Sequence, residues 1–176
     1  MLSRRAFAVS IIGLLGTVGP HAAFAEPAAA NDPVAIATAI YTRVAKGKGD
    51  GGGGFVIVNA AAKAKYLSKA LIDLWARADA HTQKGDVGPI EFDPVTNSQD
   101  PDVKSFKVAA EKTDADKAVI AVSIIGRRAP PKVAADQVVR YDFVREATGW
   151  KIDDIRGAID GEPWSVRKLL EESLKY

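Results

Sequence analysis

The chain has 176 residues, of which 47% are hydrophobic, which is typical of one globular domain with a buried core. It contains no cysteine, so disulfides, cysteine nucleophiles and thiolate metal ligands are excluded. The formal net charge is only +2, which provides no strong basic field to attract nucleic acid or an anionic membrane surface.

The first 25 residues have the three parts of a secretory signal peptide. Arg4 and Arg5 form a charged start, residues 6–18 are apolar, and residues 23–25 (AFA) match an A-x-A cleavage site. The apolar run is shorter than the ~20 residues that a transmembrane helix needs. We therefore expect cleavage after Ala25 and a periplasmic or secreted chain without a membrane span. Removal of the two arginines leaves 22 basic residues against 22 acidic ones.

Residues 3–7 (SRRAF) also match the twin-arginine export pattern S-R-R-x-F. Ala8 departs from the larger apolar residue usual there, whereas Gly13 and Gly16 make the run only mildly apolar, which fits that route. The general secretion route and the twin-arginine route both remain open. The second would permit a cofactor loaded in the cytoplasm, but no motif in the sequence indicates one, and we predict none.

A loose terminus is expected at 26–31, followed by one domain over 32–176 that starts with helices. Asp32 as cap and Pro33 as first residue predict a helix that ends near Lys46. The glycine-rich run at 47–54 lacks the G-x-x-x-x-G-K-[ST] pattern and a preceding strand, which favours a flexible loop over a phosphate site. A helical turn at 59–65 and a helix over 66–80 follow. The apolar stripe of that second helix contains Leu67, Leu71, Leu74, Trp75 and Ala78.

Strands are expected at 90–92, 103–112 and 117–126, and a hairpin at 138–155. The segment 117–126 is apolar on both faces, which indicates a central strand or an interface. In the hairpin Ile155 is out of phase with Ile152, which predicts a bulge at 153–154. A loop at 157–164 and a helix capped by Ser165 complete the chain. This order predicts an α+β domain, with helices on a curved, mostly antiparallel sheet of four to five strands and a C-terminal helix.

Three segments together resemble a known family: residues 90–94 (IEFDP) leading to 97–100 (NSQD), then 141–146 (YDFVRE), then 149–155 (GWKIDDI). They resemble a family of small exported bacterial domains of unknown function with a nuclear-transport-factor-2-like (cystatin-like) fold. The resemblance covers residues 32–176. It implies a cone of helices against a bent sheet and no established reaction. The glycines at 51–54 depart from the family pattern only in a loop.

Few residues are suited to catalysis. His81 is the only histidine after the expected cleavage site, and no G-x-S-x-G motif is present, which argues against a serine triad and a zinc site. By analogy with enzymes of the same superfamily, Tyr141 with Asp93 or Asp153 is a candidate for proton transfer inside the cone. Fold-level analogy does not establish an activity.

The polar loop at 93–102 has two further interpretations. Asp93, Asn97, Asp100 and Asp102 offer oxygen ligands to a hard cation, although their spacing is not that of an EF-hand. The same residue types also form turns by bonding their own backbone. As contacts to a partner we predict Asn97, Gln99, Asp100 and, from the expected loop at 157–164, Trp164.

Our first functional hypothesis is an exported, non-enzymatic domain that binds a small ligand or a protein partner, including inhibitor and immunity-type roles. The second is an acid–base enzyme of the isomerase or dehydratase kind that uses Tyr141 and carboxylates. The third is a cation site in the 93–102 loop. No nucleic-acid partner is expected, and a homodimer remains open.

Overall fold

A computed structural model of the protein describes residues 32–47 and 52–175. The expected signal peptide, the terminus at 26–31 and residues 48–51 of the glycine-rich run lie outside the described residues. The helices are α1 (Pro33–Ala45), the 3-10 turn η2 (Gly54–Val56), α2 (Ala60–Tyr66), α3 (Lys69–His81), η3 (Ala134–Gln137) and α4 (Val166–Ser173). The strands are β1 (Ser105–Thr113), β2 (Lys117–Ile125), β3 (Val138–Glu146), β4 (Gly149–Ile159) and β5 (Glu162–Ser165).

Each α-helix starts at a polar residue whose side chain accepts a bond from the first turn. Asp32, Asn59, Ser68 and Ser165 cap α1, α2, α3 and α4 in this way. Such caps satisfy backbone N–H groups that have no partner within the helix. The predicted starts of the first and last helices are therefore confirmed, because the signal for a cap is local.

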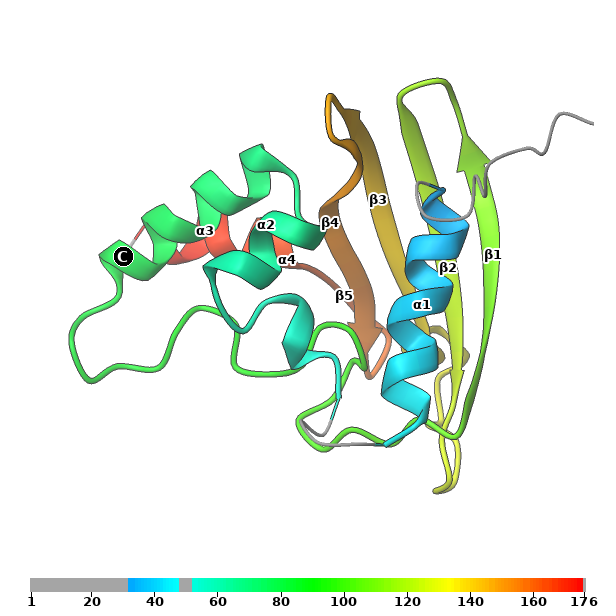
Figure 1. Ribbon diagram of the computed structural model, residues 1–176. Coiled ribbons are helices and arrows are strands. Elements are labelled where there is room, and N and C mark those ends of the chain that lie inside the picture. Colours follow the sequence, from blue (N-terminus) through cyan, green and yellow to red (C-terminus); the bar gives the residue numbers. More distant parts are fainter. Residues whose placement is uncertain (1–31, 48–51, 176) are drawn as a thin grey trace, which may run out of the picture.

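The five strands form one open sheet in the order β1-β2-β3-β4-β5, with every neighbouring pair antiparallel. Consecutive strands pair, as in a meander; three of the four connections are short turns, and residues 126–137, which include η3, join β2 to β3. Four α-helices and a five-stranded antiparallel sheet confirm the predicted α+β class. In Figure 1, α1 lies against β1 and β2, while α2, α3 and α4 gather beside β4.

The core lies between the helices and one face of the sheet. Alternate residues of β3 point into it, and Val139, Tyr141 and Phe143 are all buried. Leu71 and Leu74 of α3 fill it from the helical side. The opposite face of the sheet bears the intervening residues, many of them charged, so the alternation in the sequence assigned the two faces correctly.

The bulge predicted in the second strand of the hairpin is confirmed. Asp142 pairs with Asp154 and Phe143 pairs with Ile152, so Asp153 is the extra residue. Because of this extra residue, Ile152 and Ile155 both face the core, and each is fully buried. The bulge also frees the Asp153 side chain from the regular pleat.

Two predictions of secondary structure are wrong. Residues 90–92 form no strand, and the backbone there makes only an isolated bridge between Asp93 and Ser98. The segment 157–164 is not a loop, because β4 continues to Ile159 and returns as β5 through a turn at Asp160 and Gly161. Both turn residues have positive φ, 51° and 85°, as a tight hairpin turn requires. The Asp-Gly pair was the local signal for this turn.

The helix expected over 66–80 starts later, at Lys69. Leu67 bridges to Ile152 of β4, and the Ser68 N–H donates to the Ile152 carbonyl over 2.8 Å. These two residues are therefore extended and act as a short addition to the sheet. The tertiary contact interrupts a sequence that would otherwise continue as a helix from α2 into α3.

Candidate functional site

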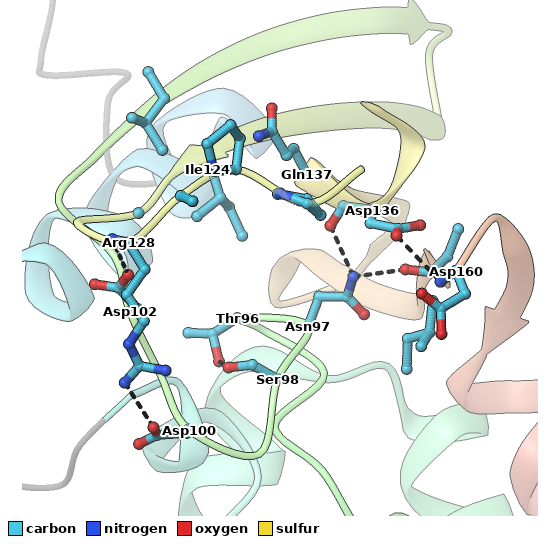
Figure 2. A pocket seen from close by; sticks show the side chains of 17 residues that line it. Thr96, Asn97, Ser98, Asp100, Asp102, Ile124, Arg128, Asp136, Gln137 and Asp160 are labelled. Carbon is cyan, nitrogen blue, oxygen red and sulfur yellow. Dashed lines mark hydrogen bonds and ion pairs between the residues drawn. The ribbon is translucent and has the colours of Figure 1, made fainter. Parts of the chain in front are cut away.

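A cavity of about 480 Å³ lies where three loops meet at one end of the sheet. Figure 2 shows the polar loop at 96–102 on one side, the connection between β2 and β3 on another, and the β4–β5 turn on the third. The lining residues are Thr96, Asn97, Ser98, Asp100, Asp102, Ile124, Ile125, Gly126, Arg128, Ala129, Pro130, Pro131, Asp136, Gln137, Ala158, Ile159 and Asp160.

The rim of the cavity is apolar and open to solvent. Ile125 and Ile159 both line it and are 55% and 47% exposed. Val133, from the connection between β2 and β3, is also exposed and lies near Gly161 of the β4–β5 turn. Exposed large aliphatic side chains that gather around a hollow are typical of binding surfaces.

Four carboxylates and one guanidinium line the same cavity. Asp102 accepts the N–H groups of Arg127 and Arg128 over 2.8 and 2.9 Å, and Asp100 is paired with the Arg128 side chain over 2.6 Å. The backbone N–H groups of Arg128 and Arg127 hold the pKa of the Asp102 carboxyl below its ordinary value. The Arg127 guanidinium lies 3.5 Å from the Asp102 carboxylate, so the two carboxylates of this wall are balanced by two arginines.

Asp136 and Asp160 provide the other two carboxylates. The Asp136 carboxylate accepts the N–H groups of Asp160 and Gly161 over 3.1 and 3.0 Å, which fixes the β4–β5 turn. Among the residues that the structure describes, none donates a hydrogen bond to the Asp160 carboxylate. Asp160 is thus the acidic group of the lining whose hydrogen-bonding capacity is most available to a ligand.

Asp93 shapes the polar loop. Its carboxylate accepts the Gly53 N–H over 2.6 Å, the Val95 N–H over 2.9 Å and the Thr96 hydroxyl over 2.8 Å. A side chain at Gly53 would collide with Val95, since an added Cβ would lie 2.0 Å from the Val95 Cβ. Gly53 of the glycine-rich run is therefore closely packed against Val95, while the flexible loop predicted over 47–54 stays a prediction.

Asn97 joins the polar loop to the far end of the sheet. Its amide nitrogen donates to the carbonyls of Asp136 and Ala158 over 2.9 and 2.7 Å, and its amide oxygen accepts the Trp164 indole N–H over 2.8 Å. It adopts a positive φ of 55°, which asparagine tolerates better than most residues. Asn97 lines the cavity, but its side-chain amide is already hydrogen-bonded to other parts of the protein.

The predicted partner residues fall into two groups. Asn97 and Asp100 line the cavity. Gln99 is exposed beside it. Trp164 lies in β5 and is half-buried against Phe92, at a ring distance of 4.9 Å, so it is not the exposed loop residue that was expected. The structure therefore brings the polar loop to a cavity and leaves Trp164 mainly as a packing residue.

Of the candidate catalytic residues, Asp93 and Tyr141 are close enough to interact electrostatically, whereas Asp153 lies at the bulge with other partners. Tyr141 is fully buried and donates to the Tyr41 hydroxyl over 3.1 Å. Asp153 accepts the Ser68 hydroxyl over 2.5 Å and the Arg167 guanidinium over 2.7 Å. Neither these two residues nor Asp93 line the cavity described above. Their side chains serve the core, a helix cap and a loop.

Asp154, the next residue, has a buried carboxyl beneath the start of α4. It accepts the Ser165 hydroxyl over 2.6 Å and the N–H groups of Ile155 and Arg167 over 2.8 and 3.0 Å. Burial raises the pKa of this carboxyl, and the three donors offset part of that shift. Because α4 starts at this point, Asp154 anchors the start of α4 to the sheet.

The suggested cation ligands are already occupied by protein donors. Asp93, Asn97, Asp100 and Asp102 bond the amides, hydroxyl and arginines named above. Within residues 32–47 and 52–175, no three histidine, aspartate or glutamate side chains come together in a way that could hold a metal ion. His81, at the end of α3, is exposed.

Several lining residues were not singled out in the sequence: Ile125, Arg128, Asp136, Ile159 and Asp160. The Asp160-Gly161 pair signals a turn, and the double proline at 130–131 signals a rigid connection. Neither signal indicates that the two segments meet the 96–102 loop. Their meeting depends on strand pairing, because β2 and β4 are both antiparallel to β3 and therefore finish at the same end of the sheet.

Comparison with known proteins found no matching protein-family model, curated protein or solved structure. The described helices include none that combines the length and hydrophobicity required to cross a bilayer.

Proposed function

We propose that this protein is an exported binding domain and that the cavity at the 96–102 loop is its ligand site. The main evidence is the cavity of about 480 Å³, which is lined in part by the exposed side chains of Ile125 and Ile159. Cavities of this size are typical of small-ligand sites. The signal peptide that we expect at residues 1–25 supports a periplasmic or secreted location.

The lining indicates the kind of ligand. Arg127 and Arg128 balance Asp102 and Asp100, whereas Asp136 and Asp160 have no ion-pair partner among the described residues and favour a cationic group. The two isoleucines with Pro130 and Pro131 favour an apolar portion beside it. An aliphatic amine has both properties, and so does a lysine side chain of a protein partner. An inhibitor or immunity-type role remains within this proposal.

Binding is better supported than acid–base catalysis. The catalytic hypothesis needs Tyr141 and a carboxylate in a shared pocket, whereas Tyr141 is buried and bonded to Tyr41. The nuclear-transport-factor-2-like assignment also remains a proposal, supported by the three sequence segments and by the packing of helices on an antiparallel sheet.

Spermidine is a suitable probe for the cavity. Cells expressing the full chain should yield periplasmic protein whose mass corresponds to a start at Glu26. Titration of this protein with spermidine should shift the amide resonance of Gly126 in a saturable manner. Asp160→Asn, which retains a residue tolerant of positive φ, should weaken binding about threefold, as expected for the loss of one partly exposed charge.

Asp86→Asn is the matched control, because Asp86 is an exposed carboxylate in a loop outside the cavity. Equal responses of the two variants would contradict the site, as would the absence of a saturable Gly126 shift.

A protein partner is tested by passing periplasmic extract over the immobilised protein. A protein from the extract that binds the wild type and the Val87→Asp variant should no longer bind the Ile159→Asp variant. Val87 is exposed and lies away from the cavity lining.

A further inference from the structure

A second cavity, of about 410 Å³, lies over β4, β5 and the start of α4. It shares only Ala158 with the first cavity. Among the described residues, three basic side chains and no acidic ones line it. The lining residues are Ala135, Arg140, Arg156, Gly157, Ala158, Gly161, Pro163, Trp164, Ser165 and Lys168.

Two of the basic residues are direct neighbours on adjacent strands. Arg140 of β3 is paired directly with Arg156 of β4, on the face opposite the core. Like charges in directly opposed positions destabilise a sheet unless other groups compensate. Glu111 and Asp142 each pair with one of these arginines, which compensates for part of the repulsion, and a bound anion would compensate for more of it.

Each arginine is held from one side by a carboxylate. Arg140 donates from Nε and Nη2 to Glu111 over 2.9 to 3.1 Å, and Arg156 donates from Nε and Nη2 to Asp142 over 2.6 and 2.7 Å. Within the described part of the chain, no acceptor bonds the Nη1 group of either arginine. The carboxylates thus restrain both guanidinium groups while leaving donors for a ligand.

Lys168 adds a third positive charge from α4. Its nearest carboxylate is that of Glu172, at 3.8 Å, which is beyond hydrogen-bond distance, and its side chain is 68% exposed. The buried carboxylate of Asp154 interacts electrostatically with Arg156, but its hydrogen bonds are made to Ser165 and to two backbone N–H groups. The three cations therefore have unused donors at one place.

We propose that this basic cavity binds the oxyanion group of a small ligand, either a carboxylate or a phosphate. Planar guanidinium groups match both oxyanions, and a lysine ammonium adds a point charge. Because Glu111 and Asp142 restrain the arginines beforehand, binding loses little side-chain entropy. This proposal does not depend on the proposed function, because it concerns the second cavity and not the one at the 96–102 loop.

Inorganic phosphate and acetate are the probes, each titrated at constant ionic strength against sodium chloride. The amide resonances of Gly157 and Gly161, which line this cavity, should shift and saturate with one or both anions, whereas that of Gly126, in the first cavity, should not. Saturation with phosphate alone identifies a phosphate ligand, and saturation with acetate alone identifies a carboxylate. No saturable shift with either anion, or the same shift with chloride, would overturn the proposal.

Two substitutions test the charges directly. Lys168→Gln should weaken anion binding about threefold. Lys69→Gln is the matched control, since Lys69 is also exposed, lies in the first turn of a helix and pairs with a carboxylate four residues later. Glu111→Gln should tighten binding about threefold, because glutamine keeps an oxygen that can accept from Arg140 and restrain it, while the negative charge is removed. A structural role for Glu111 does not predict tighter binding, so weaker or unchanged binding in that variant contradicts the site.

Discussion

The side chain of Asn97 connects three segments that are far apart in the sequence. Its two N–H bonds reach the carbonyls of Asp136 and Ala158, and its oxygen accepts the Trp164 indole. The sequence identified Asn97 as a residue of interest, but as a ligand or partner contact. An asparagine in a polar loop has the same local appearance in both roles, because the distinction depends on which distant backbone groups it meets.

Replacement of Asn97 should therefore affect stability before it affects binding. Asn97→Ala should lower the free energy of unfolding by about 3 kcal/mol, since a half-buried indole N–H and two carbonyls lose their partner and alanine disfavours positive φ. Asn97→Gly should be about 1 kcal/mol less destabilising than Asn97→Ala. Both variants lose the hydrogen bonds of the amide, but glycine adopts a positive φ without the backbone strain that alanine has. Urea denaturation measures both values.

Gln99→Ala serves as the control at this scale, because Gln99 is exposed two residues further along the same loop. It should change the free energy of unfolding by less than about 0.5 kcal/mol. If Asn97→Ala were no more destabilising than Gln99→Ala, the structural role of Asn97 would be wrong.

At the scale of elements, the junction between α2 and α3 illustrates how tertiary contact overrides helix propensity. Residues 59–80 read as nearly continuous helix, yet Leu67 and Ser68 are extended because they pair with Ile152 of β4. Ser68 then caps α3, accepting the Leu71 N–H over 3.0 Å while donating to Asp153 at the bulge. A serine inside a helical pattern was the available local signal for the new start.

Ser68→Ala should lower the free energy of unfolding by about 2 kcal/mol, because it removes a buried cap and leaves the Asp153 carboxylate without one donor. Asn59→Ala removes the cap of the shorter, exposed helix α2 and should cost about 0.5 kcal/mol. Thermal or urea unfolding compares the two. Equal losses would indicate that the contact between Ser68 and the bulge contributes nothing.

At the scale of the whole molecule, a pair of tyrosines joins the layers. Tyr41 of α1 and Tyr141 of β3 meet edge to face at 6.1 Å, their hydroxyls are hydrogen-bonded, and the Tyr41 hydroxyl donates to the carbonyl of Val95 in the polar loop. Burial raises the pKa of both phenols well above the ordinary value of 10.0. Tyr141, a catalytic candidate in the sequence, is thus part of the core.

The alkaline behaviour of the protein should reflect these two phenols. Since their pKa values are raised in the folded state, their contribution to stability is complete below the unfolded value of about 10 and is lost as the pH rises above it. A spectrophotometric titration should show two of the four tyrosines ionising only as the protein unfolds. Tyr141→Phe should reduce that late step by half.

This expectation would be wrong if all four tyrosines ionised while the far-ultraviolet circular dichroism of the protein stayed unchanged. Such a result would require at least one of the two buried hydroxyls to reach solvent. Circular dichroism recorded on the same samples separates the two cases.

The sequence by itself determined the features that depend on neighbours along the chain. Helix caps, strand alternation and the bulge at Asp153 follow from contacts between residues one to four positions apart, so the α+β class could be predicted correctly. The cavities were decided only by the tertiary structure. Asn97 and Ala158 are 61 residues apart, and Arg140 and Arg156 face each other only in the register of β3 and β4. Packing of the core selects these long-range pairs, and no local pattern records which loops they bring together.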